Sequence, residues 1–128
     1  MRFEVHGLPQ TKGSTRAFAR GSGAPVVVSD NARLKQWEQA VGWSARAAGA
    51  SMNEGAVAVD VIFYLPRAKH TKQVDALPTT RPDLDKLVRA ILDALTGICY
   101  EDDGQVVHLT ARKCYALDTP CALITVTG

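Results

Sequence analysis

Residues 57–65 show the clearest pattern in the chain, because apolar side chains occupy every second position: Val57, Val59, Val61, Phe63 and Leu65. Strict alternation is typical of a β-strand with one buried face. A strand of this kind needs neighbouring strands and a layer that covers its apolar side. The chain must therefore contain further strands that pair with residues 57–65 and a layer of secondary structure that covers their apolar face.

Two segments predict the covering helices. In residues 84–95, Leu87, Val88, Ile91 and Leu95 recur at steps of three and four, which indicates an amphipathic helix ended by Gly97. A second helix is expected from a cap at Ser29 or Asp30 to about residue 48. We interpret its two tryptophans, Trp37 and Trp43, as packing residues rather than platforms for stacked bases.

Further strands are expected at residues 2–6, 105–115 and 121–127, with a brief one at 25–28. The predicted class is α+β (mixed α/β), a four- to five-stranded mixed sheet with two helices packed against it. A length of 128 residues suits a single domain, residues 1–128.

Composition excludes several classes of protein. A hydrophobic share of 46% and a charged share of 22% argue against wholesale disorder. Cys99, Cys114 and Cys121 show no paired spacing, so neither a disulfide framework nor a zinc site is favoured. No apolar run approaches the ~20 residues of a membrane span, and no signal peptide is recognisable. We expect a cytoplasmic location without membrane contact.

Acidic residues flank the predicted helix of residues 84–95. Asp83 and Asp85 lie where an extended segment that includes Pro82 meets the helix, so both side chains can converge there. The simplest interpretation is a helix cap and a first-turn acid, each stabilising by about 0.5–2 kcal/mol. Likewise, Asp102 and Asp103 precede Gly104 in a turn and can be ordinary solvated acids.

The functional alternative is that packing brings the two acidic clusters together at one end of the sheet. Several carboxylates there would repel one another unless a cation bound between them. Mg²⁺ prefers oxygen ligands and is commonly held by a few carboxylates together with substrate phosphate oxygens, as in a phosphodiesterase. Arg89 can stabilise the transition state, or can pair within the helix with Asp85 or Asp93.

The net charge of +2 is weakly basic, but the basic residues cluster in the loop after residue 10 and before Asp83. The alternative to nucleic-acid binding is that each is an ordinary loop charge. As a group beside an acidic site they favour contact with DNA phosphates. The candidates are Lys12, Arg16, Arg20, Arg67, Lys69, Lys72 and Lys86.

The segment RPDLDKLVRAILDALTGICYEDDGQVVHL, residues 81–109, resembles the signature of the RusA family of Holliday junction resolvases. It combines a D-x-D motif, a helix carrying D-A-L-T-G, an aromatic residue and D-D-x-Q-V-V. The rest of the chain agrees more loosely, through an N-terminal strand ending in G-x-P, a basic loop, a helix and a long strand.

The resemblance implies a homodimeric, Mg²⁺-dependent endonuclease that resolves four-way DNA junctions by paired, symmetric phosphodiester hydrolysis in recombination and repair. Such enzymes are often encoded by phages and prophages. The family's metal-binding acids fall on Asp83, Asp85 and Asp103, with Asp102 the adjacent acid, and its catalytic lysine falls on Arg89. The family usually has asparagine where this chain has Lys86.

A guanidinium is a poor proton donor, so Arg89 is expected to act through its charge. Two other functions fit the same residues. One is a junction-binding protein with weak or lost cleavage. The other is a metal-dependent nuclease for other branched nucleic acids.

Overall fold

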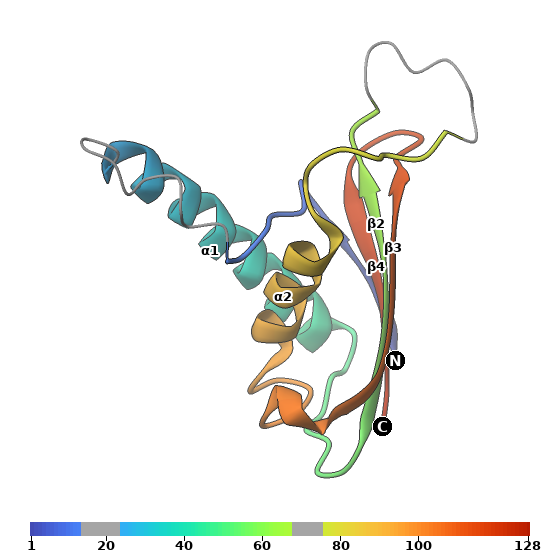
Figure 1. Cartoon of the computed structure of the whole chain (residues 1–128). Coiled ribbons are helices and arrows are strands. Elements are labelled where there is room, and N and C mark those ends of the chain that lie inside the picture. Colours follow the sequence, from blue (N-terminus) through green and yellow to red (C-terminus); the bar gives the residue numbers. More distant parts are fainter. Residues whose placement is uncertain (14–23, 68–75) are drawn as a thin grey trace.

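The computed structural model describes residues 1–13, 24–67 and 76–128, and for residues 24–31 the backbone alone. The elements follow the order β1 (Arg2–His6), α1 (Ala24–Ala47), β2 (Val57–Leu65), α2 (Leu84–Leu95), a 3-10 turn η2 (Asp103–Gln105), β3 (Val106–Tyr115) and β4 (Cys121–Thr127). The four strands form one sheet, and both helices pack on the same face of it (Figure 1). The predicted α+β class is confirmed.

The sheet has the strand order β1-β4-β2-β3. β4 is antiparallel to both of its neighbours, whereas β2 and β3 run parallel. A parallel pair needs a crossover connection, and α2 supplies it, as is usual for such units. The last strand in the sequence therefore lies inside the sheet, and β3 forms one edge.

The alternation of residues 57–65 has the predicted outcome. Val57, Val59, Val61, Phe63 and Leu65 are all at most 3% exposed and face the helices. From the helix layer, Leu87, Ile91 and Leu95 of α2 are fully buried against them, and α1 adds Trp37, Val41 and Ala45. Each fully buried aliphatic side chain of this size stabilises the fold by about 1.5–3 kcal/mol.

Two expectations were wrong. Residues 25–28 are helical, because α1 begins at Ala24 with Pro25 in its first turn, where a proline costs no hydrogen bond; Ser29 and Asp30 therefore lie within the helix and not at its expected cap. Trp43 is 70% exposed, because it points away from the face of α1 that carries Val41 and Ala45. Trp37 does pack in the core, and its ring lies against the backbone of Gly7.

Among the described helices, none is both long enough and apolar enough to cross a membrane.

Candidate metal centre and nucleic-acid interface

Asp83 occupies the N-cap position of α2 with an extended backbone, φ −73° and ψ 134°. Its carboxylate accepts no hydrogen bond from the amides of the first helical turn. The simple capping interpretation of Asp83 therefore does not describe this side chain. Asp85 lies in the first turn and is also exposed, so two carboxylates stand at the positive end of the helix with oxygens available to a cation.

In the described residues, Lys86 forms an ion pair with this site. Its Nζ lies 3.7 Å from Oδ2 of Asp83, at a half-buried position one turn into α2. An ammonium at this distance offsets part of the repulsion between Asp83 and Asp85. The same ammonium group places a positive charge beside Asp83 and Asp85, where an anionic group such as a phosphate could bind.

Lys113 fixes the segment that leads into the D-x-D motif of Asp83 and Asp85. This role was not predicted from the sequence. Its Nζ donates to the carbonyl oxygens of Thr80 and Pro82, both at 2.9 Å, and so ties β3 to the segment before Asp83. The sequence signal that could have predicted this contact is the position of Lys113 on the same side of β3 as Leu109 and Ala111, because a lysine on an apolar side needs a polar partner.

The turn η2, which begins at Asp103, follows the opposite end of α2 and leads into β3 (Figure 1). Helix α2 has 12 residues and is therefore about 18 Å long. Asp83 precedes its first turn, whereas Asp103 follows its last turn and leads into β3. The expectation that packing brings the two acidic clusters together is wrong for one copy of the chain, because the whole helix separates them. Within the described ranges, no three Asp, Glu, His or Cys side chains form a group able to hold a metal ion.

Asp102 and Asp103 differ in their surroundings. The Asp102 carboxylate accepts a hydrogen bond from the amide of Gly104 at 2.9 Å and caps η2, while Gln105 Oε1 accepts from the amides of Glu101 and Asp102. This is a capping box. The exposed carboxylate of Asp103 has no hydrogen-bond partner of this kind within the described ranges. Asp102 thus has a structural role, and Asp103 remains available as a ligand.

Tyr100 closes the C-terminal end of α2. Its buried hydroxyl donates to the carbonyl oxygen of Leu92 at 2.8 Å. Burial raises the pKa of the Tyr100 phenol, since the charged phenolate loses its hydration there, and the nearby carboxylate of Asp103 acts in the same direction. The aromatic residue before the second acidic cluster is therefore a packing residue that fixes where the acidic turn begins.

Arg89 is exposed on α2, one turn beyond Asp85. The segment after β1 crosses α2 at this point: the amide of Lys12 donates to the carbonyl oxygen of Lys86, and a Cβ built at Gly13 would lie only 3.0 Å from an Arg89 nitrogen. Arg89 forms no salt bridge with Asp85 or Asp93 in the part of the chain that the structure describes. Its guanidinium therefore stays available for an anion.

Lys12 is engaged within the protein. Its Nζ lies 2.7 Å from Oδ2 of Asp93 and 3.3 Å from Oε2 of Glu38. The hydrogen bond to Asp93, together with the charge of Glu38, raises the pKa of Lys12, although partial burial opposes this. The structure therefore uses this lysine to join the N-terminal segment to both helices.

Arg67, a further described candidate for DNA contact beside Lys12 and Lys86, stacks on the ring of Tyr115 at 5.3 Å from the centroid. The remaining candidates, Arg16, Arg20, Lys69 and Lys72, lie outside the described residues. Among the described residues, Lys86 is paired with Asp83, Arg89 follows Asp85 by one helical turn, and Lys113 contacts Pro82, the residue before Asp83.

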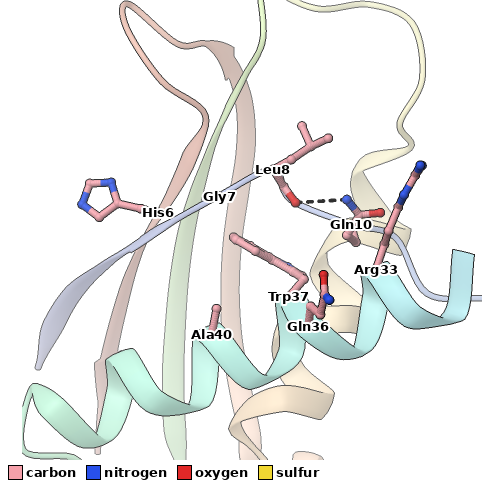
Figure 2. A pocket seen from close by; sticks show the side chains of 8 residues that line it. All are labelled: His6, Gly7, Leu8, Gln10, Arg33, Gln36, Trp37 and Ala40. Carbon is pink, nitrogen blue, oxygen red and sulfur yellow. Dashed lines mark hydrogen bonds between the residues drawn. The ribbon is translucent and has the colours of Figure 1, made fainter. Parts of the chain in front are cut away.

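A pocket of about 380 Å³ lies between α1 and the segment that follows β1 (Figure 2). Trp37 forms its floor, and Gln10, which donates to the carbonyl oxygen of Leu8, stands at its rim with Arg33. Among the described residues that line this pocket there is no carboxylate. It is therefore separate from the acidic residues of α2 and η2.

Comparison with known proteins identifies the family of the chain. The profile of the family described as endodeoxyribonuclease RusA matches residues 7–127. A relative from Bacillus subtilis (strain 168), the uncharacterised protein YqaN, is 33% identical over 127 residues, an alignment that covers 91% of this chain and 88% of the relative. The matched span includes both acidic clusters, the helix between them and strands β2, β3 and β4, whereas β1 precedes it. The chain belongs to the RusA family of endodeoxyribonucleases.

Proposed function

We propose that this protein is a homodimeric, Mg²⁺-dependent endonuclease that resolves four-way DNA junctions by paired hydrolysis of phosphodiester bonds. Membership of an endodeoxyribonuclease family supports a nuclease that acts on DNA. The single observation that supports the metal site is the exposed carboxylate of Asp83, which stands at the N-cap position of α2 without accepting a hydrogen bond from the helix and has Lys86 3.7 Å away.

The residues fit a magnesium ion. Mg²⁺ keeps several waters and takes one or two carboxylates in addition to phosphate oxygens. Asp83 and Asp85 supply that number of carboxylates at one helix end, with oxygen donors only. When bound, the ion would polarise the scissile phosphate and lower the pKa of an attacking water.

The positions of the acids also support the homodimer. Asp103 cannot reach Asp83 within one copy, because α2 stands between them. If all three aspartates serve one metal centre, Asp103 comes from a second copy. A twofold axis then creates two identical centres, which suits the paired incisions needed to resolve a junction with two equivalent strands.

The chain's own side chains would bind and orient the DNA. Arg89 can form paired hydrogen bonds to a phosphate through its planar guanidinium, and Lys86 adds charge between Arg89 and Asp83. Neither group is suited to take a proton from water at neutral pH, because both are cationic. Their role is to hold the phosphate and to stabilise the negative charge that develops on it.

The test is cleavage of a synthetic four-way junction and of a linear duplex of matched sequence, each with Mg²⁺ or with EDTA. We expect metal-dependent, symmetric nicks in the junction alone, and their loss in Asp83→Asn, Asp85→Asn and Asp103→Asn with junction binding retained. Binding without nicks in the unaltered protein would instead identify a junction-binding protein. Nicks in flaps or single strands but not in the junction would identify a different branched substrate.

A further inference from the structure

Two consecutive residues, Lys12 and Gly13, cross α2 along one stripe of the helix. The helix residues that they contact are Lys86, Arg89 and Asp93, which follow one another at steps of three and four and therefore share a face. The amide of Lys12 donates to the carbonyl oxygen of Lys86 at 3.1 Å, and Lys12 Nζ lies 2.7 Å from Oδ2 of Asp93. Gly13 lies against Arg89, between these two contacts.

Asp93 is a natural competitor for the guanidinium of Arg89. It lies four residues after Arg89, a spacing at which opposite charges on a helix pair with each other. Yet Arg89 has no ion pair within residues 1–13, 24–67 and 76–128, and Asp93 pairs with Lys12 instead. Lys12 therefore occupies the carboxylate that would otherwise take up the arginine.

The charges around Lys12 show how much depends on this one ammonium group. Besides Asp93, it lies 3.3 Å from Oε2 of Glu38 on α1, so one cation faces two anions. The side chains of Lys12 and Asp93 are 38% and 35% exposed, which limits the screening of their attraction by water. Without Lys12, two uncompensated carboxylates would remain in this region, and Asp93 could turn to Arg89.

Gly13 provides the space in which the Arg89 side chain lies. Its φ of +98° is one that other residues rarely adopt, and a Cβ there would come within 3.0 Å of Nη1 and 3.8 Å of Cζ of Arg89. A side chain at position 13 would thus displace the guanidinium. The backbone bond from Lys12 to Lys86 fixes Gly13 at this place on the helix.

From these contacts we propose that Lys12 is a positioning residue for Arg89: by holding Asp93, it keeps the guanidinium unpaired and available to a DNA phosphate. The proposal rests on the proposed function for the identity of the anion. It assigns an indirect role in DNA binding to a lysine whose own charge is directed into the protein. The other carboxylate four residues from Arg89 is Asp85, a predicted ligand of the metal ion.

The first test needs neither DNA nor metal. The Nε–Hε resonance of Arg89 is recorded by NMR of the isotope-labelled chain and identified by its absence in Arg89→Lys. It should shift in Lys12→Met, because Asp93 then captures the guanidinium, and should move back in Lys12→Met combined with Asp93→Asn. Lys12→Arg, which retains the cation, should leave it near its original position. A resonance that does not respond to Lys12→Met would refute the proposal.

The second test measures the affinity for a synthetic four-way junction in EDTA by fluorescence anisotropy. Lys12→Met should weaken binding about 10-fold, the effect of losing one charge-assisted hydrogen bond. Adding Asp93→Asn should restore the affinity to within about 2-fold of that of Asp93→Asn alone, because the two residues act through one contact. A loss that persists in this double variant would mean that Lys12 binds DNA directly, and would overturn the proposal.

Glu38 provides the matched control for charge. Lys12→Met combined with Glu38→Gln has the same net charge as the double variant with Asp93→Asn, but it leaves Asp93 free to pair with Arg89. Binding should therefore remain weak in this control, and the Arg89 resonance should remain shifted. Equal recovery in both double variants would show that overall charge alone matters and would contradict the positioning role.

Gly49 provides the matched control for the backbone. Its φ of +91° is close to that of Gly13, but a Cβ at Gly49 would meet nothing within 4 Å. Both Gly13→Ala and Gly49→Ala introduce a similar backbone strain, and only Gly13→Ala should shift the Arg89 resonance. Equal spectra of Arg89 in the two variants would count against the proposal. The resonance shifts are independent of DNA, so a chain that shows them but neither binds nor cuts a junction would refute the proposed function alone.

Discussion

The ammonium nitrogen of Lys113 lies 2.9 Å from the carbonyl oxygen of Pro82, the residue directly before Asp83. The same nitrogen donates to the carbonyl oxygen of Thr80, so one side chain of β3 fixes two residues of the segment that delivers the D-x-D motif. The position of Asp83 therefore depends on a strand that lies far from it in the sequence.

Replacing Lys113 by methionine keeps the length of the side chain and removes both hydrogen bonds. We expect nicking of junction DNA to fall by about 10- to 100-fold, because a small displacement of a reacting group is costly. Junction affinity should change much less than the nicking rate. Lys113→Arg, which keeps the donors, is the control and should retain more activity than Lys113→Met; equal activity of all three proteins would contradict the positioning role.

We expect Asp102 to have a structural role and Asp103 to be needed for nicking. Asp102→Ala removes the cap of η2 and should lower the free energy of unfolding by about 0.5–2 kcal/mol while nicking persists. Asp103→Ala should abolish nicking and change stability by less than about 0.5 kcal/mol. Urea denaturation and a nicking assay on both variants decide this, and the reverse pattern would exchange the two roles.

Mixing two inactive variants tests whether the acids of one centre come from two copies. In a mixed dimer of Asp83→Asn and Asp103→Asn, one centre carries both substitutions and the other carries none. After subunit exchange, half of the dimers are mixed, so we expect about a quarter of the unaltered nicking rate, as single nicks. Centres contained within one copy would stay inactive in the mixture, and that result would exclude the shared arrangement.

Tyr100 predicts a pH dependence of stability. Its pKa is raised in the folded protein, so its contribution is complete below the ordinary tyrosine value of about 10 and declines as the pH rises through the folded value. Tyr100→Phe loses the hydrogen bond to Leu92 and should cost about 1 kcal/mol at pH 7. Above about pH 10 the variant should lose stability less steeply. Urea denaturation at both pH values measures the difference, and parallel losses would show that Tyr100 does not titrate on unfolding.

The elements of the fold were largely predictable because their patterns are local. The strand at residues 57–65 and the helix at 84–95 appear at the predicted positions, since burial of one face dictates which residues recur. The start of α1 was not predictable in this way: the β-branched residues 26–28 favour a strand locally, yet the chain there is helical. Strand order also depends on pairings between distant residues that no local pattern records.

The sequence proposes residues for the candidate site but does not give their geometry. Asp83, Asp85 and Asp103 stay predicted ligands, and their separation depends on the direction of α2 and on the parallel pairing of β2 with β3. The contacts of Lys12 were likewise not predictable from the sequence. A loop lysine favours DNA contact by composition, whereas its ion pairs with Asp93 and Glu38 arise only when three distant segments meet.

The place of β4 has a consequence for synthesis of the protein. β4 lies between β1 and β2, so the first strand to leave the ribosome has no strand to pair with until residues 121–127 follow. Helix α2, with Asp83 and Asp85 at its N-terminal end, can form earlier, but the sheet that supports it is completed last. We expect incomplete chains to remain without a stable fold, so that nuclease activity appears only after β4 has been made.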